Sequence, residues 1–275
     1  MHKERISVLG CGWLGLPLAE QLAAEGYMVR GSTTRDDKLE GLREKGIDPF
    51  LIRFDPEAEG DGILDFLQSD VLIVNIPPPR RSDVVEYHIA QFSSLIDALG
   101  QSPVRFVLMV SSTSVYPAAG GRMREDDAGN PESAAGQALL FVEEMLMAES
   151  GFQTTIIRFG GLTGYERAPR YLLAHLSEIS DPDKPMNLIH RDDAVAIIGE
   201  IIRLGQWGEI FNACAPHHPS RRDYYGQAAE RAGIPMPPIP ALPSTPSSTK
   251  LVDSQKLVAA LDYSFRHPDL TALPE

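Results

Sequence analysis

Three glycines near the start of the chain have the spacing of a turn that holds phosphate groups. Gly10, Gly12 and Gly15 follow an apolar run and precede a helical pattern with Pro17 in its first turn. In such a unit the first glycine permits a tight turn, the second lets the backbone approach a diphosphate, and the third lets helix and strand pack closely. The N–H groups and dipole at the helix start favour the anion. An ordinary glycine turn is the alternative. The predicted dinucleotide-binding residues of this turn are Gly10, Cys11, Gly12, Trp13, Leu14 and Gly15.

The end of the second predicted strand indicates which dinucleotide is bound. NAD sites usually carry an Asp or Glu here, whereas this chain has Ser32, Thr33 and Arg35. Hydroxyls and a guanidinium suit a 2′-phosphate, so the sequence favours NADP over NAD. Asp36 and Asp37 follow directly and count against this preference, unless they cap the next helix.

Four further residues after predicted strands are expected near the cofactor. They are Asp55, Asn75, Pro77 and Ser111. Asp55 either meets the adenine region or only begins a turn with the proline that follows it.

The elements that must position these residues alternate along the first part of the chain. Strands are predicted at 6–9, 27–31, 49–54, 71–76, 105–111 and 154–159, and helices near 16–25, 36–45, 62–68, 83–99 and 135–149. This alternation predicts an α/β fold, a Rossmann-type doubly wound parallel sheet. Residues 1–160, with 187–214 returning to them, are expected to form the dinucleotide-binding core. Residues 160–164 are expected to form a glycine-rich turn. Residues 161–186 and 215–275 are expected to form a small C-terminal substrate-side lobe.

Composition excludes several classes of partner. With 25 Lys and Arg against 38 Asp and Glu, the net charge is −13, which argues against binding to nucleic acid and anionic membranes.

The two cysteines, Cys11 and Cys214, form no C-x-x-C pair, so no metal site is predicted. The chain shows neither a signal peptide nor an apolar run of bilayer length, so a cytoplasmic location is expected.

The glycine turn and several later segments together resemble one superfamily. The segments lie at 10–19, 111–116, 158–164, 187–194, 210–216, 261–263 and 268–269. They are similar to the extended short-chain dehydrogenase/reductases, the NAD-dependent epimerase/dehydratase type. Extended members usually read G-x-x-G-x-x-G, and the G-x-G-x-x-G spacing here places the chain closest to the atypical, YeeZ-like members.

The resemblance implies a catalytic serine and shows what is missing. It maps the substrate-contacting Ser or Thr of the fifth strand to Ser112. It places the usual Tyr-x-x-x-Lys acid/base pair near Gly136 and Leu140, where neither residue type occurs. Tyr116 is a weaker candidate for that role, because it also reads as a packing residue.

Three other helix residues are expected to be peripheral. Glu143 and Glu144 are expected to face solvent or a dimer partner. His88 is expected on a helix surface. The resemblance implies a homodimer formed through the helices near 83–99 and 135–149.

Five residues are expected on the substrate side of the cleft: Ser114, Arg158, Arg167, Arg170 and His190. Arg158 either lies near the nicotinamide or pairs with a buried carboxylate. Arg167 and Arg170, three apart, suit a phosphate or carboxylate, or are solvated loop charges. His190 either reaches substrate or has a structural role.

Two functions remain open from the sequence. One is an NAD(P)-dependent oxidoreductase or epimerase/dehydratase-like protein acting on a small polar substrate such as a sugar nucleotide. The other is a non-catalytic, NADP-sensing regulatory protein. The retained Ser112 favours the first, and the missing Tyr-Lys pair favours the second.

Overall fold

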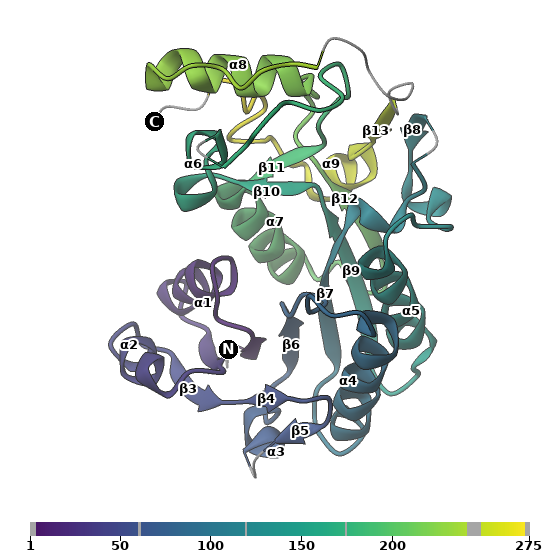
Figure 1. Ribbon diagram of the computed structural model, residues 1–275. Helices are drawn as coiled ribbons and strands as arrows, with labels where there is room; N and C mark the ends of the chain where they lie inside the picture. The colour runs from purple at the N-terminus through teal and green to yellow at the C-terminus, as the bar shows by residue number, and fades with distance from the viewer. Residues whose placement is uncertain (1–3, 60–61, 119, 174, 241–248, 273–275) are drawn as a thin grey trace.

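A seven-stranded parallel sheet forms the centre of the molecule (Figure 1). The computed structural model describes residues 4–59, 62–118, 120–173, 175–240 and 249–272. The strands run in the order β12-β9-β7-β6-β1-β2-β3. Their bounds are β1 Arg5–Leu9, β2 Met28–Thr33, β3 Asp48–Leu51, β6 Val71–Val74, β7 Phe106–Ser112, β9 Gln153–Phe159 and β12 Ile210–Ala213. The predicted doubly wound α/β fold is therefore confirmed.

Helices cover both faces of this sheet. Their bounds are α1 Gly15–Ala24, α2 Leu39–Arg43, α3 Ile63–Phe66, α4 Val84–Leu99, α5 Ala134–Ala148, α6 Pro169–Leu173, α7 Arg191–Leu204, α8 Arg221–Ala232 and α9 Gln255–Leu261. Helices α4 and α5 pack on one face, and α1 and α7 on the other. The continuously apolar β6, Val71–Val74, is fully buried because it is covered from both sides.

In the described residues, six short strands lie outside the central sheet. They are β4 Arg53–Phe54, β5 Ala58–Glu59, β8 Gly121–Met123, β10 Gly161–Thr163, β11 Leu188–His190 and β13 Lys250–Val252. They pair as β4 with β5, β10 with β11, and β8 with β13. The expected glycine-rich turn at 160–164 was therefore wrong in part, because β10 runs through it. In Figure 1, β10, β11, α6 and α8 lie together beyond the main sheet. The exact division into core and substrate-side lobe stays a prediction.

The expectation that His88 lies on a helix surface was wrong. Its side chain is fully buried in α4, its Nδ1 lies 3.0 Å from Oε1 of Gln91, and its ring packs edge-on against Phe92. Burial lowers the pKa of His88, so the neutral ring is favoured.

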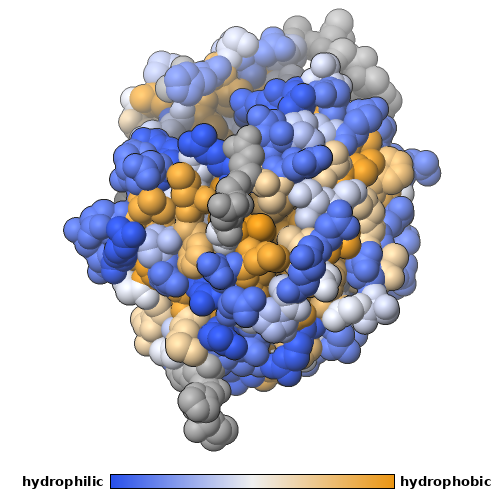
Figure 2. Space-filling model, turned by 90° about the horizontal axis from the view of Figure 1, so that it is seen from below, coloured by the Kyte–Doolittle hydropathy of each residue, from blue (hydrophilic) through white to orange (hydrophobic). Residues whose placement is uncertain are grey.

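The exposed surface mixes polar and apolar side chains. On the face seen in Figure 2, hydrophilic side chains predominate and hydrophobic ones gather near the middle. Among the described residues, every helix is too short or too polar to span a bilayer.

Candidate functional site

The glycine turn lies where the direction of the strand order reverses, between β1 and β6. Gly10 has φ +101°, and a Cβ there would lie 2.7 Å from the carbonyl oxygen of Asn75. A Cβ at Gly15 would lie 2.1 Å from the Gly10 carbonyl oxygen, so α1 can approach the strand end only without a side chain. A Cβ at Gly12 would meet nothing within 4 Å. Gly12 thus leaves the open space beside the backbone that a diphosphate needs.

Neighbouring strands hold this turn in place. The Gly10 N–H donates to Ser32 Oγ at 2.8 Å, and the Cys11 N–H donates to the Ser32 carbonyl at 2.8 Å. Asn75 Nδ2 donates to the Gly10 carbonyl at 3.0 Å. The Ser32 hydroxyl, which is buried, therefore shapes the turn. Burial raises the pKa of Cys11 to about 12, so its thiol stays protonated and packs as a small side chain.

Two adjoining cavities form a cleft across the turn. Their volumes are about 490 Å³ and 370 Å³. Both are lined by Gly12, Asn75, Ile76 and Pro77. A cleft at the carboxyl ends of the strands, at the point where strand order reverses, is where doubly wound sheets bind ligands.

The smaller cavity carries cationic and hydroxyl groups in its lining. Thr33, Thr34, Arg35 and Lys38 line it, and none of its described lining residues is acidic. Arg35 forms an exposed ion pair with Asp37, which lies outside this lining. Sequence reasoning missed Lys38, although its position three residues after Arg35 at a helix start was a usable signal.

Asp55 lies outside both cavities. It accepts a hydrogen bond from the Tyr87 hydroxyl at 2.8 Å and begins the turn between β4 and β5.

Of the two serines that line the larger cavity, Ser111 and Ser112, only Ser112 is suited to contact a ligand. Ser111 is buried and donates to Glu143 Oε1 at 2.5 Å, so its hydroxyl is engaged. Ser112 lines the cavity, and its Oγ accepts from the Ser114 N–H at 3.2 Å. Within the described part of the chain its O–H donates to no recorded acceptor, so it can donate to a ligand. The remaining lining at this end includes Phe159, Gly160, Gly161, Leu162 and Arg167.

Helix α5 has no room for a side chain at Gly136, near which the resemblance places the usual tyrosine. A Cβ at Gly136 would lie 2.4 Å from the backbone oxygen of Ser114. The helix therefore has no room for a side chain at this position, and it presents Leu139 to the cavity beside Ser112. Tyrosine and lysine are both absent from α5, Ala134–Ala148.

Replacing Gly136 with alanine is expected to destabilise the protein by about 1–3 kcal/mol, because backbone must move to admit the new Cβ. Denaturant unfolding measures the effect. Gly151→Ala is the matched control, since a Cβ there meets nothing within 4 Å. Equal stability of the two variants would contradict the close approach of α5 to Ser114.

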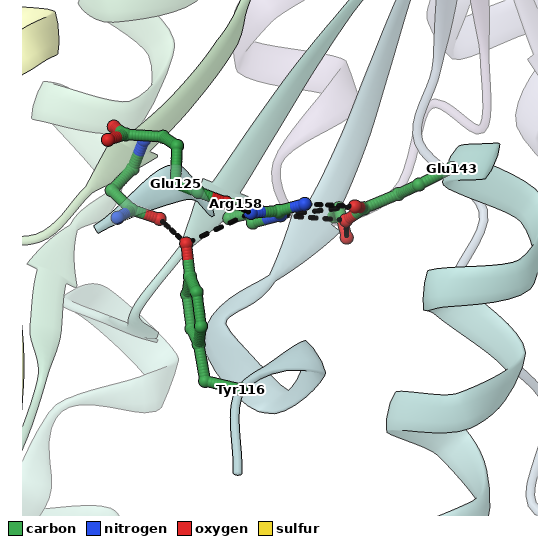
Figure 3. Close-up of polar contacts among 6 residues, drawn as sticks. Tyr116, Glu125, Glu143 and Arg158 are labelled. Atoms are coloured by element: carbon green, nitrogen blue, oxygen red, sulfur yellow. Dashed lines mark hydrogen bonds and ion pairs between the residues drawn. The ribbon is translucent and has the colours of Figure 1, made fainter. Parts of the chain in front are cut away.

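A buried network of polar side chains contacts Ser111. Arg158 and Glu143 form an ion pair of 2.7 Å, with both side chains 3% exposed. Arg158 also donates to the Tyr116 hydroxyl at 3.0 Å, and that hydroxyl donates to Asn212 Oδ1 at 2.6 Å (Figure 3). Of the two roles left open for Arg158, the structure places it against a buried carboxylate. The expectation that Glu143 is peripheral was wrong.

The pKa shifts of this group follow from its burial. Burial raises the pKa of Tyr116 to about 12, although Arg158 opposes the rise. Burial alone would lower the pKa of Arg158, but the bonds to Glu143 outweigh it and the pKa is raised. Tyr116 is therefore neutral, buried and fully bonded.

The predicted substrate-side arginines Arg167 and Arg170 contact different rings, and only Arg167 is in the lining of the larger cavity. Arg167 lies 4.3 Å from the centre of the Trp13 ring and lines the larger cavity. Arg170 lies over the Tyr171 ring and donates to its hydroxyl.

His190 has a structural contact at the start of α7. Its Nδ1 accepts from the Asp192 N–H at 3.2 Å. A Cβ on Gly164 would lie 2.3 Å from its Nε2, so the ring packs tightly against that glycine. The neighbouring Asp193 is buried and accepts from the Tyr263 hydroxyl and from the N–H groups of residues 266 and 267.

Lys250 is a cation beside the serine segment. Its Nζ lies 3.4 Å from the Thr113 carbonyl oxygen. Burial lowers its pKa, with Lys184 adding to the effect. It comes from β13, far along the chain, and Asn187 fixes that strand by bonding to the Lys250 carbonyl and the Val252 N–H.

Known proteins resemble this chain in sequence and in fold. No protein-family model matches it. It is 31% identical to protein YeeZ of Escherichia coli K12 over 273 residues, covering 98% of this chain and 99% of YeeZ.

Two solved epimerases share the fold. The UDP-Glc/GlcNAc 4-epimerase of Campylobacter jejuni superposes with a TM-score of 0.81 at 14% identity, covering 97% of this chain and 95% of that one. The UDP-glucuronic acid 4-epimerase of Bacillus cereus, solved with UDP-glucuronic acid and NAD, gives 0.79 at 19% identity, with coverage of 97% and 95%. The chain therefore belongs to the YeeZ family and has the fold of the NAD-dependent epimerases and dehydratases.

Proposed function

We propose that this protein binds NADP in the cleft across the glycine turn. The observation that carries the proposal is the cavity end lined by Thr33, Thr34, Arg35 and Lys38 without an acidic residue. Ribose hydroxyls of NAD are usually met by a carboxylate, whereas a 2′-phosphate is met by cations and hydroxyls. The residues present fit the dinucleotide, since Gly12 leaves open space at the start of a ten-residue helix.

We further propose that the larger cavity holds a small polar substrate, such as a sugar nucleotide, for an oxidoreductase or epimerase/dehydratase-like reaction. When bound, the nicotinamide supplies a hydride donor or acceptor. Ser112 donates a hydrogen bond to a substrate oxygen. The structural neighbour MoeE5 was solved with UDP-glucose and NAD, which supports this substrate class.

A non-catalytic, NADP-sensing role is the second candidate. The observation that favours it is the packing of α5, where Gly136 excludes a side chain and Leu139 takes the place beside Ser112.

Turnover separates the two candidates. Purified protein is incubated with NADP or NAD and a panel of UDP-sugars, and products are resolved by chromatography. Turnover that falls at least tenfold in Ser112→Ala is expected for the enzyme, because a hydrogen bond to the reacting oxygen is lost. NADP binding without turnover of any panel member, or turnover unchanged in Ser112→Ala, would contradict the catalytic proposal. The first of these results would favour the sensor.

Charge reversal at Arg35 tests the choice of cofactor. Arg35→Glu is expected to weaken NADP binding by about tenfold or more and to leave NAD binding unchanged, because only NADP carries the 2′-phosphate. Calorimetric titration measures both. Arg43→Glu is the matched control, since Arg43 lies on α2 outside the lining of both cavities. NADP affinity equal to that of the control would contradict the assignment.

A further inference from the structure

Side chains from other segments of the chain contact Trp13, the tryptophan of the glycine turn. The guanidinium carbons of Arg167 and Arg191 lie 4.3 Å and 5.0 Å from the centre of the Trp13 ring. The Trp13 indole N–H donates to Glu166 Oε2 at 3.0 Å. Arg191 also lies 3.7 Å from the centre of the Tyr165 ring. Stacking of this kind fixes the plane of a guanidinium and leaves its edge N–H groups available.

Two acidic side chains, Asp37 and Glu166, line the same cavity as Arg191, and Glu166 also bonds to Trp13. Among the residues that the structure describes, neither Arg167 nor Arg191 has a carboxylate within 4.0 Å. The Nε of Arg191 is buried and has no hydrogen-bond partner in the same part of the chain. Arg35, by contrast, is paired with Asp37. In a chain of net charge −13, two guanidinium groups beside one turn, neither in a direct ion pair with a described carboxylate, favour a bound anion.

The cavities place this charge next to the glycine backbone. Arg167 lines the cavity of about 490 Å³. Arg191 lines another of about 590 Å³. Both cavities are also lined by Gly12 and Trp13, so the open backbone at Gly12 borders both the cavity of Arg167 and the cavity of Arg191.

We propose that Arg167 and Arg191, held by Trp13, bind the diphosphate of the dinucleotide. This inference rests on the proposed function and names residues beyond the glycine turn that act at the same site. The N–H groups at the start of α1 supply one set of donors to the diphosphate, and the arginine pair supplies a second. Because the pair comes from the segment 165–167 and the start of α7, nucleotide binding ties these segments to the glycine turn.

Binding of three nucleotides tests the proposal. NADP, NAD and ADP-ribose all carry the diphosphate, and only NADP carries the 2′-phosphate. Arg167→Gln and Arg191→Gln are expected to weaken the binding of all three by a similar factor, about tenfold each. Arg231→Gln, at the exposed end of α8, is the matched charge control and is expected to bind all three as wild type does. Calorimetric titration gives the affinities, and thermal unfolding verifies that each variant is folded.

Each outcome decides one question. Unchanged binding of all three nucleotides in both folded variants overturns the arginine proposal and leaves NADP binding intact. Loss of NADP binding alone also overturns it, because the pair would then read the 2′-phosphate. A wild-type protein that binds none of the three overturns the proposed function itself. Arg191 is partly buried, so Arg191→Gln could fail to fold. Arg167 is exposed, so Arg167→Gln then decides the question alone.

Discussion

Replacing Glu143 with alanine is expected to lower the free energy of unfolding by about 3–5 kcal/mol, the usual effect of breaking a buried ion pair from one side. The guanidinium of Arg158 would remain charged while 3% exposed, without the carboxylate that it now contacts through both its Nε and Nη2 atoms. The buried hydroxyl of Ser111 would lose its acceptor as well. This loss is large compared with the total stability of a typical domain.

Urea unfolding measures this effect, and the neighbouring residue provides the control. Glu144 is exposed on the same helix, so Glu144→Ala is expected to change stability by less than about 0.5 kcal/mol. The double replacement Glu143→Leu with Arg158→Met is expected to recover most of the loss, because no unpaired charge remains. If Glu143→Ala unfolds at the same urea concentration as Glu144→Ala, the ion pair of Glu143 and Arg158 does not stabilise the fold as predicted.

Replacing Gly12 with aspartate is expected to weaken NADP binding at least about 100-fold, or about 3 kcal/mol, while the fold is retained. The new carboxylate would occupy the space reserved for the diphosphate and would repel it. The fold should tolerate the change, since a Cβ at Gly12 meets nothing within 4 Å. An acidic side chain at the start of a helix also interacts favourably with the helix dipole.

A second open glycine controls for the added charge. A Cβ at Gly151 also meets nothing within 4 Å, and Gly151 lies in the turn between α5 and β9. Gly151→Asp is therefore expected to bind NADP as wild type does. Gly12→Asp that keeps wild-type affinity would show that the nucleotide does not approach this turn.

Local patterns in the sequence were sufficient for the central sheet. Each of the six strands predicted in the first 160 residues corresponds to a strand of the structure. Apolar runs and helical periodicity were sufficient for this, because both patterns depend only on residues that are close in sequence. The glycine spacing likewise located the turn between β1 and α1. Most residues predicted at strand ends line the cleft, whereas Asp55 lies outside it.

The parts that could not be predicted depend on contacts between distant segments. Glu143 resembles any charged residue of a helix until Arg158 is placed beside it by β9. Strand β8 is three residues long and is defined by its pairing with β13, 129 residues later in register. The closeness of Gly136 to Ser114 depends on how α5 packs against the segment after β7. Short elements and buried charges of this kind have no local signature.

Titration of the wild-type protein with NADPH, followed by nicotinamide fluorescence, tests the central claim most directly. The account predicts saturable binding at one site per chain, tighter for NADPH than for NADH, with the affinity for NADPH lost in Gly12→Asp. No saturable signal with either NADPH or NADH, at nucleotide concentrations that saturate a known nicotinamide enzyme in the same assay, would contradict it.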